Sequence, residues 1–266
     1  MVDWGIIKMF IDLSLTISPH SVELADVEIE YISHREGAEL LGAPAGISAD
    51  AFPDGLGLSL ERISLTSHTA THIDAPLHYG PNSEGIESKN ITELPLDWFY
   101  SDGVVLRFNE DPECGDITIN EVQEVLSSIH YTIKPSDIVL LQMGGDKLWG
   151  TQAYLTQFRG VSAEATEWII DQGVKVIGVD TFGFDAPFDK MLSRYKKDKS
   201  NKALWPSHIL GRRKSYCQIE RLANLHRIPK TSGFKVACFP IKIEKSGAGW
   251  TRAVAIVDDE GDHYEK

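Results

Sequence analysis

The alternation of apolar and polar residues predicts several strands, beginning near the start of the chain. Residues from Phe10 to Ile17 alternate between the two types and stop before Pro19, as expected for a half-buried strand. Residues 137–143 and 174–179 are continuous apolar runs, which are typical of strands covered on both faces. Further strands are predicted at residues 103–108, 235–243 and 251–257.

Two segments have the periodicity of helices. One runs from Asn120 to Ile129, with Thr118 as its cap. The other begins at Ser162, and the acidic residues in its first turns suit the positive end of the helix dipole. Residues 184–203 are charged and are expected to be exposed, while residues 218–225 are interpreted as a short turn or helix.

Before residue 74 the chain has an irregular segment followed by a segment with a regular strand pattern. Residues 20–57 lack periodicity and are rich in Gly, Ala, Pro and Ser, which is more typical of a functional loop or lid than of a passive linker. From Leu58 the chain is predicted to form one long strand. The apolar residues Ile63, Leu65 and Ile73 share one face of this strand, and polar residues line the other.

The composition is that of a soluble globular protein. The 266 residues, of which 42% are hydrophobic and 24% charged, predict a single α/β domain over residues 1–266. A net charge of −13 argues against nucleic acid as the main partner. No apolar run approaches the about 18 residues of a membrane span, so a transmembrane helix and a membrane partner are not expected. The expected partner is a small-molecule substrate.

The cysteines and the N-terminal residues favour a cytoplasmic location. Cys114, Cys217 and Cys238 are isolated and odd in number, which fits reduced thiols better than a disulfide framework. The charged residues Asp3 and Lys8 interrupt the early apolar residues, so the start of the chain does not resemble a signal peptide.

The strongest chemical signal is the segment S-H-T-A-T-H-I-D-A-P-L-H-Y, which starts at Ser67. It holds His68, His72, Asp74 and His78 within eleven residues. Imidazole and carboxylate are the ligands that Zn2+ and Mn2+ take from proteins. On a strand His68, His72 and Asp74 would point to one face, with the small Ala70 between the histidines. A single histidine on a strand is more often structural, but three ligand residues on one face predict a metal site.

No other catalytic motif competes with this cluster, since HExxH, CxxC, GxSxG and phosphate-loop patterns are all absent. His208, in W-P-S-H-I-L-G, and Glu220, in I-E-R-L-A-N-L, are weak signals when taken alone. Asp180 follows a buried strand, where α/β folds often place functional groups. A carboxylate that caps neighbouring backbone N–H groups is an equally good interpretation of that residue.

The segment resembles the cyclase-like metal-dependent hydrolase family, which includes bacterial kynurenine formamidases, isatin hydrolases and some polyketide-pathway cyclases. The family signature H-x-G-T-H-x-D-x-P-x-H is matched by H-T-A-T-H-I-D-A-P-L-H, from His68 to His78. The resemblance covers residues from about 10 to 257. It includes Asp12-Leu-Ser, Gly178-Val-Asp180-Thr181 with Asp185, His208, and Glu220 with Asn224-Leu225.

The resemblance implies a role for each matched residue. His68, His72 and Asp74 would bind one metal ion, and His78 would transfer a proton. His208 and Glu220 would help to hold a second ion in binuclear members. The cofactor would be Zn2+ or Mn2+, as one or two ions. The implied fold is a compact α/β domain of the swivelling β/β/α type, with mixed strands and flanking helices, assembled as a homodimer or homotetramer.

Three features depart from the family pattern. Ala70 replaces the signature glycine, a small change that a strand would tolerate. The usual D-T-P-S is Asp180-Thr-Phe-Gly in this chain. The tryptophan that formamidases carry in the N-terminal loop has no counterpart after Pro19, which argues against formylkynurenine as the substrate.

The predicted function is metal-dependent hydrolysis of a C–N amide bond, or opening of a small cyclic amide or lactone. The metal would activate a water molecule and polarise the carbonyl, with His78 as general acid and base. A metal-dependent cyclase or dehydratase, and an arylformamidase acting on formylkynurenine, are alternatives. A non-catalytic binding protein is disfavoured because such a protein would not need both the ligands and the base.

Overall fold

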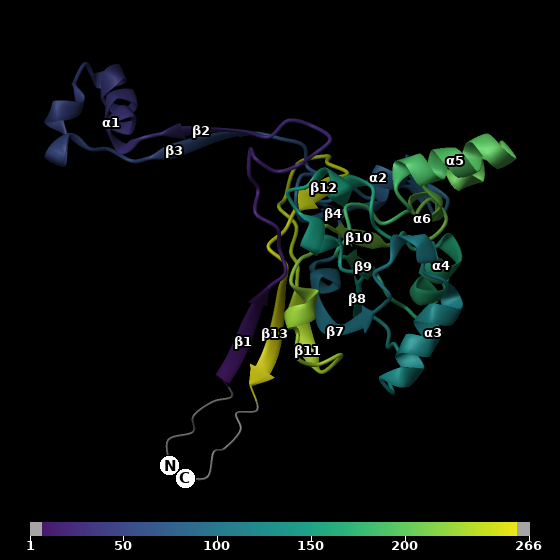
Figure 1. Cartoon of the computed structure of the whole chain (residues 1–266). Helices are drawn as coiled ribbons and strands as arrows, with labels where there is room; N and C mark the ends of the chain where they lie inside the picture. Colours follow the sequence, from purple (N-terminus) through teal and green to yellow (C-terminus); the bar gives the residue numbers. More distant parts are fainter. Residues whose placement is uncertain (1–6, 260–266) are drawn as a thin grey trace, which may run out of the picture. The chain divides into compact units, whose positions relative to one another are not determined.

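The computed structural model describes residues 7–259, which form two compact units. Residues 17–66 make up one unit, and the remainder of the described chain makes up the other, larger one. Figure 1 shows the elements of both units, and each unit is described separately below. In the described part of the chain no helix has the length and apolar character needed to cross a bilayer.

The larger unit is built on a nine-stranded sheet with the order β1-β13-β11-β7-β8-β9-β10-β4-β12 (Figure 1). The four central strands β7, β8, β9 and β10 are parallel, and the strands on either side of them are antiparallel. The strands are β1 (Ile7–Asp12), β4 (His72–Asp74), β7 (Tyr100–Arg107), β8 (Ile138–Gln142), β9 (Val176–Val179), β10 (Cys217–Glu220), β11 (Phe234–Ala237), β12 (Ala248–Trp250) and β13 (Val254–Asp259).

The central strands divide their side chains between two hydrophobic cores. Successive residues on a strand point to opposite faces, so Val104 and Leu106 of β7 enter one core while Val105 enters the other. In β8, Val139 joins the first core and Leu140 the second. Both faces of these strands are therefore covered, which explains their unbroken apolar sequences.

Helices α3 (Ile119–Ser128) and α4 (Ala163–Asp171) cover the core that contains Val104. Thr118 caps α3 in a capping box with Glu121, and Ser162 caps α4, so both predicted caps are confirmed. The other helices of this unit are α2 (Pro76–Tyr79), α5 (Phe188–Asp198) and α6 (Pro206–Leu210). Its short strands and 3-10 helices are β5 (Asn82–Ser83), β6 (Ile86–Glu87), η4 (Leu96–Phe99), η5 (Pro112–Cys114), η6 (Gly145–Leu148), η7 (Gln152–Leu155), η8 (Asn201–Ala203) and η9 (Leu225–Arg227).

The smaller unit consists of a two-stranded antiparallel ribbon and one helix. The ribbon pairs β2 (Glu28–Ile32) with β3 (Leu60–Ser64), and α1 (His34–Gly42) follows β2 directly. Ser33 and Glu36 form the capping box of α1. Three 3-10 helices complete the unit: η1 (Ala43–Ala45), η2 (Ala49–Ala51) and η3 (Pro53–Gly55).

The predicted mixed α/β class is confirmed, but several predicted elements were wrong. Residues 20–57 are not irregular throughout, because they contain β2 and α1. The long strand predicted from Leu58 ends at Ser64, and the chain turns through residues 67–71 before β4. Within this turn Ala70 has a φ of 52°, in the left-handed region that no regular strand adopts, so the segment does not run into β4 as one strand.

Three further predictions need correction. Residues 217–220 form the buried strand β10 rather than a turn or helix, because they pair with β9 on one side and β4 on the other. Residues 184–203 are not all exposed, since Phe184 and Asp185 are buried. The outer strands are displaced from their predicted bounds: β1 ends at Asp12, β11 ends at Ala237 and β13 begins at Val254. Whether residues 20–57 act as a lid stays a prediction.

Candidate metal centre

The centre forms where strands β4 and β10 lie side by side at one end of the parallel strands. Their antiparallel pairing places His72 directly opposite Glu220. Nε2 of His72 lies 3.4 Å from Oδ1 of Asp74 and 3.6 Å from Oε2 of Glu220. The three residues are buried, and one potential ligand atom from each lies within 4.8 Å of the other two. Residues 148 positions apart are thus brought together by strand pairing.

His68 and His78 approach the same carboxylate from the two ends of β4. His68 lies in the turn before the strand, and its Nδ1 is 2.9 Å from Oδ1 of Asp74. His78 lies on α2, immediately after the strand, with its ring centroid 4.2 Å from that of His68. His68, Asp74 and His78 form a second group whose potential ligand atoms all lie within 4.8 Å of one another. Asp74 therefore belongs to both groups.

His208 completes the cluster from helix α6. Its Nε2 lies 3.8 Å from Oδ2 of Asp74 and 3.6 Å from Oε1 of Glu220. On the other side of the ring, Nδ1 lies 2.6 Å from Oδ2 of Asp185. An ionised carboxylate can only accept, so Nδ1 donates this hydrogen bond and Nε2 is the ring nitrogen that faces the centre.

His72 is oriented in the same way by the backbone. Its Nδ1 lies 2.8 Å from the carbonyl oxygen of Ala70, which can only accept a hydrogen bond. Nε2 of His72 is therefore the ring nitrogen that faces Asp74 and Glu220. Metal-binding histidines commonly donate their second ring N–H to a carbonyl or carboxylate in this manner.

The donor atoms at the centre lack hydrogen-bond partners, which tests whether a cation fits. Both carboxylate oxygens of Asp74 and Nε2 of His72 are buried, and none has a hydrogen-bond partner among the described residues. The approach of His68 to Asp74 does not have hydrogen-bond geometry. Buried polar atoms without partners are costly, and lone pairs that face one another repel. A divalent cation would satisfy all of them, so the residues form a candidate metal site.

The protonation of the cluster follows from burial and from its mutual charges. Burial alone would raise the pKa of Asp74, but His72, His78 and His68 outweigh this effect and hold that pKa well below its usual range. Burial lowers the pKa of His208, yet the hydrogen bond to Asp185 and the nearby carboxylates raise it to about 9. Without a metal, His208 is thus protonated at neutral pH.

His78 differs from the other histidines of the cluster because it is the most exposed. Desolvation by the surrounding protein, followed by the neighbouring His68 and His208, lowers the pKa of His78 to about 4, against the opposing effect of Asp74. Its imidazole is therefore neutral at physiological pH and can accept a proton. Open access to solvent and a neutral ring are the properties that a proton-transferring residue needs.

The structure brings all six predicted site residues together, although their roles stay predictions. The prediction that a straight strand aligns His68 with His72 and Asp74 was wrong, because His68 lies in a turn. A residue without a predicted role, Asp185, orients His208. Its only sequence signal was its place in the family resemblance, five residues after Asp180.

Asp180 lies outside the cluster and caps backbone groups, as the second interpretation of that residue predicted. Its two carboxylate oxygens accept hydrogen bonds from the backbone N–H groups of Met143 and Gly144, at 2.8 and 2.9 Å. Burial raises the pKa of Asp180 to about 7, although these two hydrogen bonds oppose the shift. The carboxylate thus joins the ends of β8 and β9.

Phe182 and Arg221 border the cluster at the ends of two adjacent parallel strands. Phe182 follows β9 and Arg221 follows β10. The Arg221 guanidinium lies 4.0 Å from the centroid of the Phe182 ring, and its Nε donates a hydrogen bond of 3.0 Å to the Phe182 carbonyl. Arg221 has a φ of 62°, a costly conformation for a residue next to a candidate ligand.

Comparisons with known proteins agree with this geometry. Residues 11–186 match the Cyclase family, which is described as "Putative cyclase". The chain is 25% identical over 146 residues to a kynurenine formamidase of Erythrobacter litoralis (strain HTCC2594), a match that covers 54% of this chain and 58% of the relative. The match thus spans less than two thirds of that relative's length.

A second relative and a solved structure extend the comparison. A kynurenine formamidase of Paracidovorax citrulli (strain AAC00-1) is 23% identical over 198 residues, which cover 74% of this chain and 79% of the relative. The structure of isatin hydrolase A from Ralstonia solanacearum superposes with a TM-score of 0.73 at 22% identity, and the match covers 94% of this chain and 92% of that one. This likeness shows a shared fold.

Proposed function

Because the chain belongs to the Cyclase family, we propose that it is a metal-dependent hydrolase. It cleaves a C–N amide bond, or opens a small cyclic amide or lactone. One observation carries this proposal: within residues 7–259 the buried carboxylate of Asp74 has no hydrogen-bond partner for either oxygen, and His68, His72 and His208 surround it. The donor set suits a divalent cation, and its most exposed member is a neutral imidazole.

The candidate ligands favour Zn2+ or Mn2+, as one or two ions. A bound ion of this kind polarises a carbonyl group and lowers the pKa of water. His72, Asp74 and Glu220 would hold an ion on one side of Asp74, and His68 would do so on the other. Because Asp74 lies within reach of His72 and Glu220 on one side and of His68 on the other, its carboxylate could be shared by two ions. Asp185 keeps Nε2 of His208 directed at the same carboxylate.

His78 is the acid–base residue of the proposed reaction. Its ring is neutral at physiological pH and lies beside His68, at the exposed side of the cluster. It can take a proton from the attacking water and return it to the leaving nitrogen or oxygen. The other histidines of the cluster are less suited, because His72 is fully buried and His208 is hydrogen-bonded to Asp185.

The names of the relatives support amide chemistry. Two are kynurenine formamidases, and one structural neighbour is an isatin hydrolase. These names favour formamide hydrolysis as the second candidate function. The region after Pro19 has no tryptophan to pack on an aromatic substrate, so we place formylkynurenine below other small amides. A cytoplasmic location and a homo-oligomeric state are part of the same proposal.

Hydrolysis of a small panel of substrates tests the proposal. The protein is stripped with a chelator, reloaded with Zn2+ or Mn2+, and supplied with formanilide, isatin and a small aromatic lactone. We expect ring opening or amine release by the reloaded protein only. Asp74→Asn should abolish this activity, while Asp97→Asn, an equivalent change at an exposed site, should preserve it. Lack of turnover of every substrate by the metal-loaded protein would favour the cyclase or dehydratase alternative.

A further inference from the structure

One wall of the candidate metal centre is formed by residues 181–184, which follow strand β9 and which we call the β9 loop. The backbone N–H of Phe184 donates a hydrogen bond of 2.8 Å to Oε1 of Glu220. The backbone N–H of Arg221 donates a hydrogen bond of 3.1 Å to the carbonyl of Thr181. The loop is therefore fastened both to a candidate ligand and to the residue that follows this ligand.

The backbone of Arg221 departs from the strand that precedes it. Side chains alternate along a strand, so the residue after Glu220 would be expected to share the face of Ile219, which belongs to the core on the other side of the sheet. Arg221 instead has a φ of 62°, and its guanidinium lies 4.0 Å from the centroid of the Phe182 ring. This conformation is costly for a residue with a side chain, and strain of this kind gathers at functional sites.

The positive charge of Arg221 reaches the candidate ligands. Burial lowers the pKa of His68, the carboxylates of Asp74 and Glu220 raise it above its ordinary value, and the charge of Arg221 opposes that rise. The His68 side chain is 31% exposed, against 13% for His208. Arg221 therefore lies towards the more exposed side of the cluster.

The Arg221 side chain is held in a form that suits a carboxylate. Its Nε donates a hydrogen bond of 3.0 Å to the Phe182 carbonyl, and its planar group stacks on the Phe182 ring. A fixed guanidinium matches the two oxygens of a carboxylate and loses little freedom when it binds one. The family pattern has proline at the position of Phe182, and proline offers no aromatic face, so this stack is not part of that pattern.

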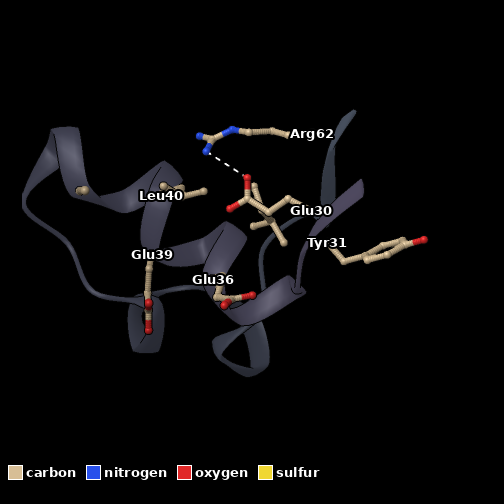
Figure 2. Close-up of a pocket in the computed structure, with 8 residues that line it drawn as sticks. Glu30, Tyr31, Glu36, Glu39, Leu40 and Arg62 are labelled. Carbon is tan, nitrogen blue, oxygen red and sulfur yellow. Dashed lines mark hydrogen bonds and ion pairs between the residues drawn. The ribbon is translucent and has the colours of Figure 1, made fainter. Parts of the chain in front are cut away.

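A pocket of about 440 Å³ in the smaller unit provides a contrast (Figure 2). Glu30, Glu36 and Glu39 line it. Arg62, its basic lining residue, forms an ion pair with Glu30 at 3.2 Å. Three carboxylates would repel an anionic molecule, so an anionic substrate needs a different site.

We propose that Arg221 binds a carboxylate group of the substrate, and that the enzyme acts on small amides or lactones that carry a negative charge. The inference deepens the hydrolase function and rests on it. Because Arg221 follows Glu220 directly, one small molecule can reach both the guanidinium and the candidate metal centre. Phe182 acts as a positioning residue, since its ring and its carbonyl hold the guanidinium.

Pairs of substrates that differ only in charge test the proposal. Formamidobenzoates with the carboxylate in the ortho, meta or para position are compared with the matching formamidobenzamides, which have nearly the same shape and no charge. We expect the wild type, loaded with Zn2+ or Mn2+, to prefer at least one anionic isomer by about 10- to 100-fold in kcat/KM. Equal kcat/KM values within all three pairs would overturn the proposal.

Arg221→Gln should remove this preference. The contact is made before and during the reaction, so its loss should raise the KM of the anionic substrate and leave kcat nearly unchanged. The KM of the neutral substrate should stay that of the wild type. A purely structural role of Arg221 would instead change the two substrates of a pair alike, and that result would overturn the proposal.

Three further variants sharpen the assignment. Arg221→Lys keeps the charge without the planar fork and should retain only part of the preference. Phe182→Leu removes the ring that holds the guanidinium and should reduce the preference in the same direction. Arg227→Gln, at an exposed position in η9, is the control and should keep it in full. Circular dichroism of each variant checks that the fold is retained.

Binding without turnover separates this proposal from the hydrolase function. Ureidobenzoates and ureidobenzamides, in which a urea that resists hydrolysis replaces the formamide, are titrated calorimetrically into the metal-loaded wild type and Arg221→Gln. We expect at least one anionic isomer to bind the wild type about tenfold or more tightly than its neutral partner, and Arg221→Gln to lose the difference. Equal affinities in the wild type would overturn the carboxylate site, even if neutral amides are hydrolysed. A difference that depends on Arg221, without hydrolysis of any substrate, would support the carboxylate site and contradict the hydrolase function.

Discussion

Asp185 accepts a hydrogen bond from Nδ1 of His208 over 2.6 Å, and this contact directs the other ring nitrogen at Asp74 and Glu220. Asp185 itself is buried and also accepts a hydrogen bond from the backbone N–H of Ser207 at 2.8 Å. The carboxylate is therefore held by helix α6 at the same time as it orients a residue of that helix. A ligand side chain is thus positioned by a second residue.

The first prediction concerns Asp185→Asn. The amide can no longer accept through both oxygens, so Nδ1 of His208 loses its charged acceptor. We expect metal affinity to fall about 10- to 100-fold, as is typical when a partner of a ligand histidine is lost. Titration with Zn2+ in competition with a chromophoric chelator measures the change. The nearby, exposed Asp189→Asn is the control, and equal affinities in the two variants would refute an orienting role for Asp185.

The second prediction separates proton transfer from metal binding. His78→Ala should lower kcat about 10²- to 10⁴-fold while the metal content stays that of the wild type. His72→Ala should remove the metal and the activity together, because His72 is fully buried and makes two of the short contacts in the cluster. Metal analysis and initial rates on the same samples distinguish the two outcomes. If His78→Ala also loses the metal, His78 is a ligand and not the acid–base residue.

The third prediction concerns backbone strain at Ala70. The left-handed conformation costs alanine about 1–2 kcal/mol, and glycine regains part of this while adding entropy to the unfolded chain. We expect Ala70→Gly to raise the free energy of unfolding by about 0.5–1 kcal/mol. Ala75, which is also buried but has a φ of −89°, provides the contrast. Ala75→Gly should lower the same quantity in urea denaturation, and a loss of stability in both variants would contradict the strain at Ala70.

The fourth prediction uses the raised pKa of Asp180. Burial raises this pKa from 3.8, the value of an ordinary aspartate side chain, to about 7. Between these two pH values the folded state therefore binds the proton more tightly than the unfolded state does. Stability from this group is therefore present at low pH and is lost as the pH rises towards 7, by up to about 1.4 kcal/mol per pH unit. Asp180→Asn should remove this slope. Denaturation of variant and wild type from pH 4 to 8 measures it, and parallel curves would contradict the assignment.

The sequence predicted the cluster more reliably than the local structure that builds it. The run from His68 to His78 concentrates ligand types so strongly that the site could be identified without the correct backbone. The turn at Ala70 was missed because the apolar alternation of β3 continues past Ser64, and nothing in that alternation reports a positive φ. The family pattern carries glycine at this position, which was the available signal for a turn.

Long-range pairing accounts for most of what the sequence could not predict. Residues 217–220 mix polar and apolar side chains and lack a strand pattern of their own. They form β10 because β9 and β4 lie on either side, and this pairing brings Glu220 to His72. The position of Asp185 depends in the same way on a contact with α6, 23 residues further along the chain. Contacts between distant residues leave no periodic trace in a single sequence.

The measurement that tests the central claim most directly is metal content by plasma mass spectrometry. Wild type, Asp74→Asn and the control Asp97→Asn are each loaded with Zn2+ or Mn2+ and passed through gel filtration. We predict one or two ions per chain in the wild type and the control, and a loss of ions in Asp74→Asn, because Asp74 belongs to both groups of candidate ligands. A wild type that retains no metal, or an Asp74→Asn variant that retains as much as the wild type, would contradict the account.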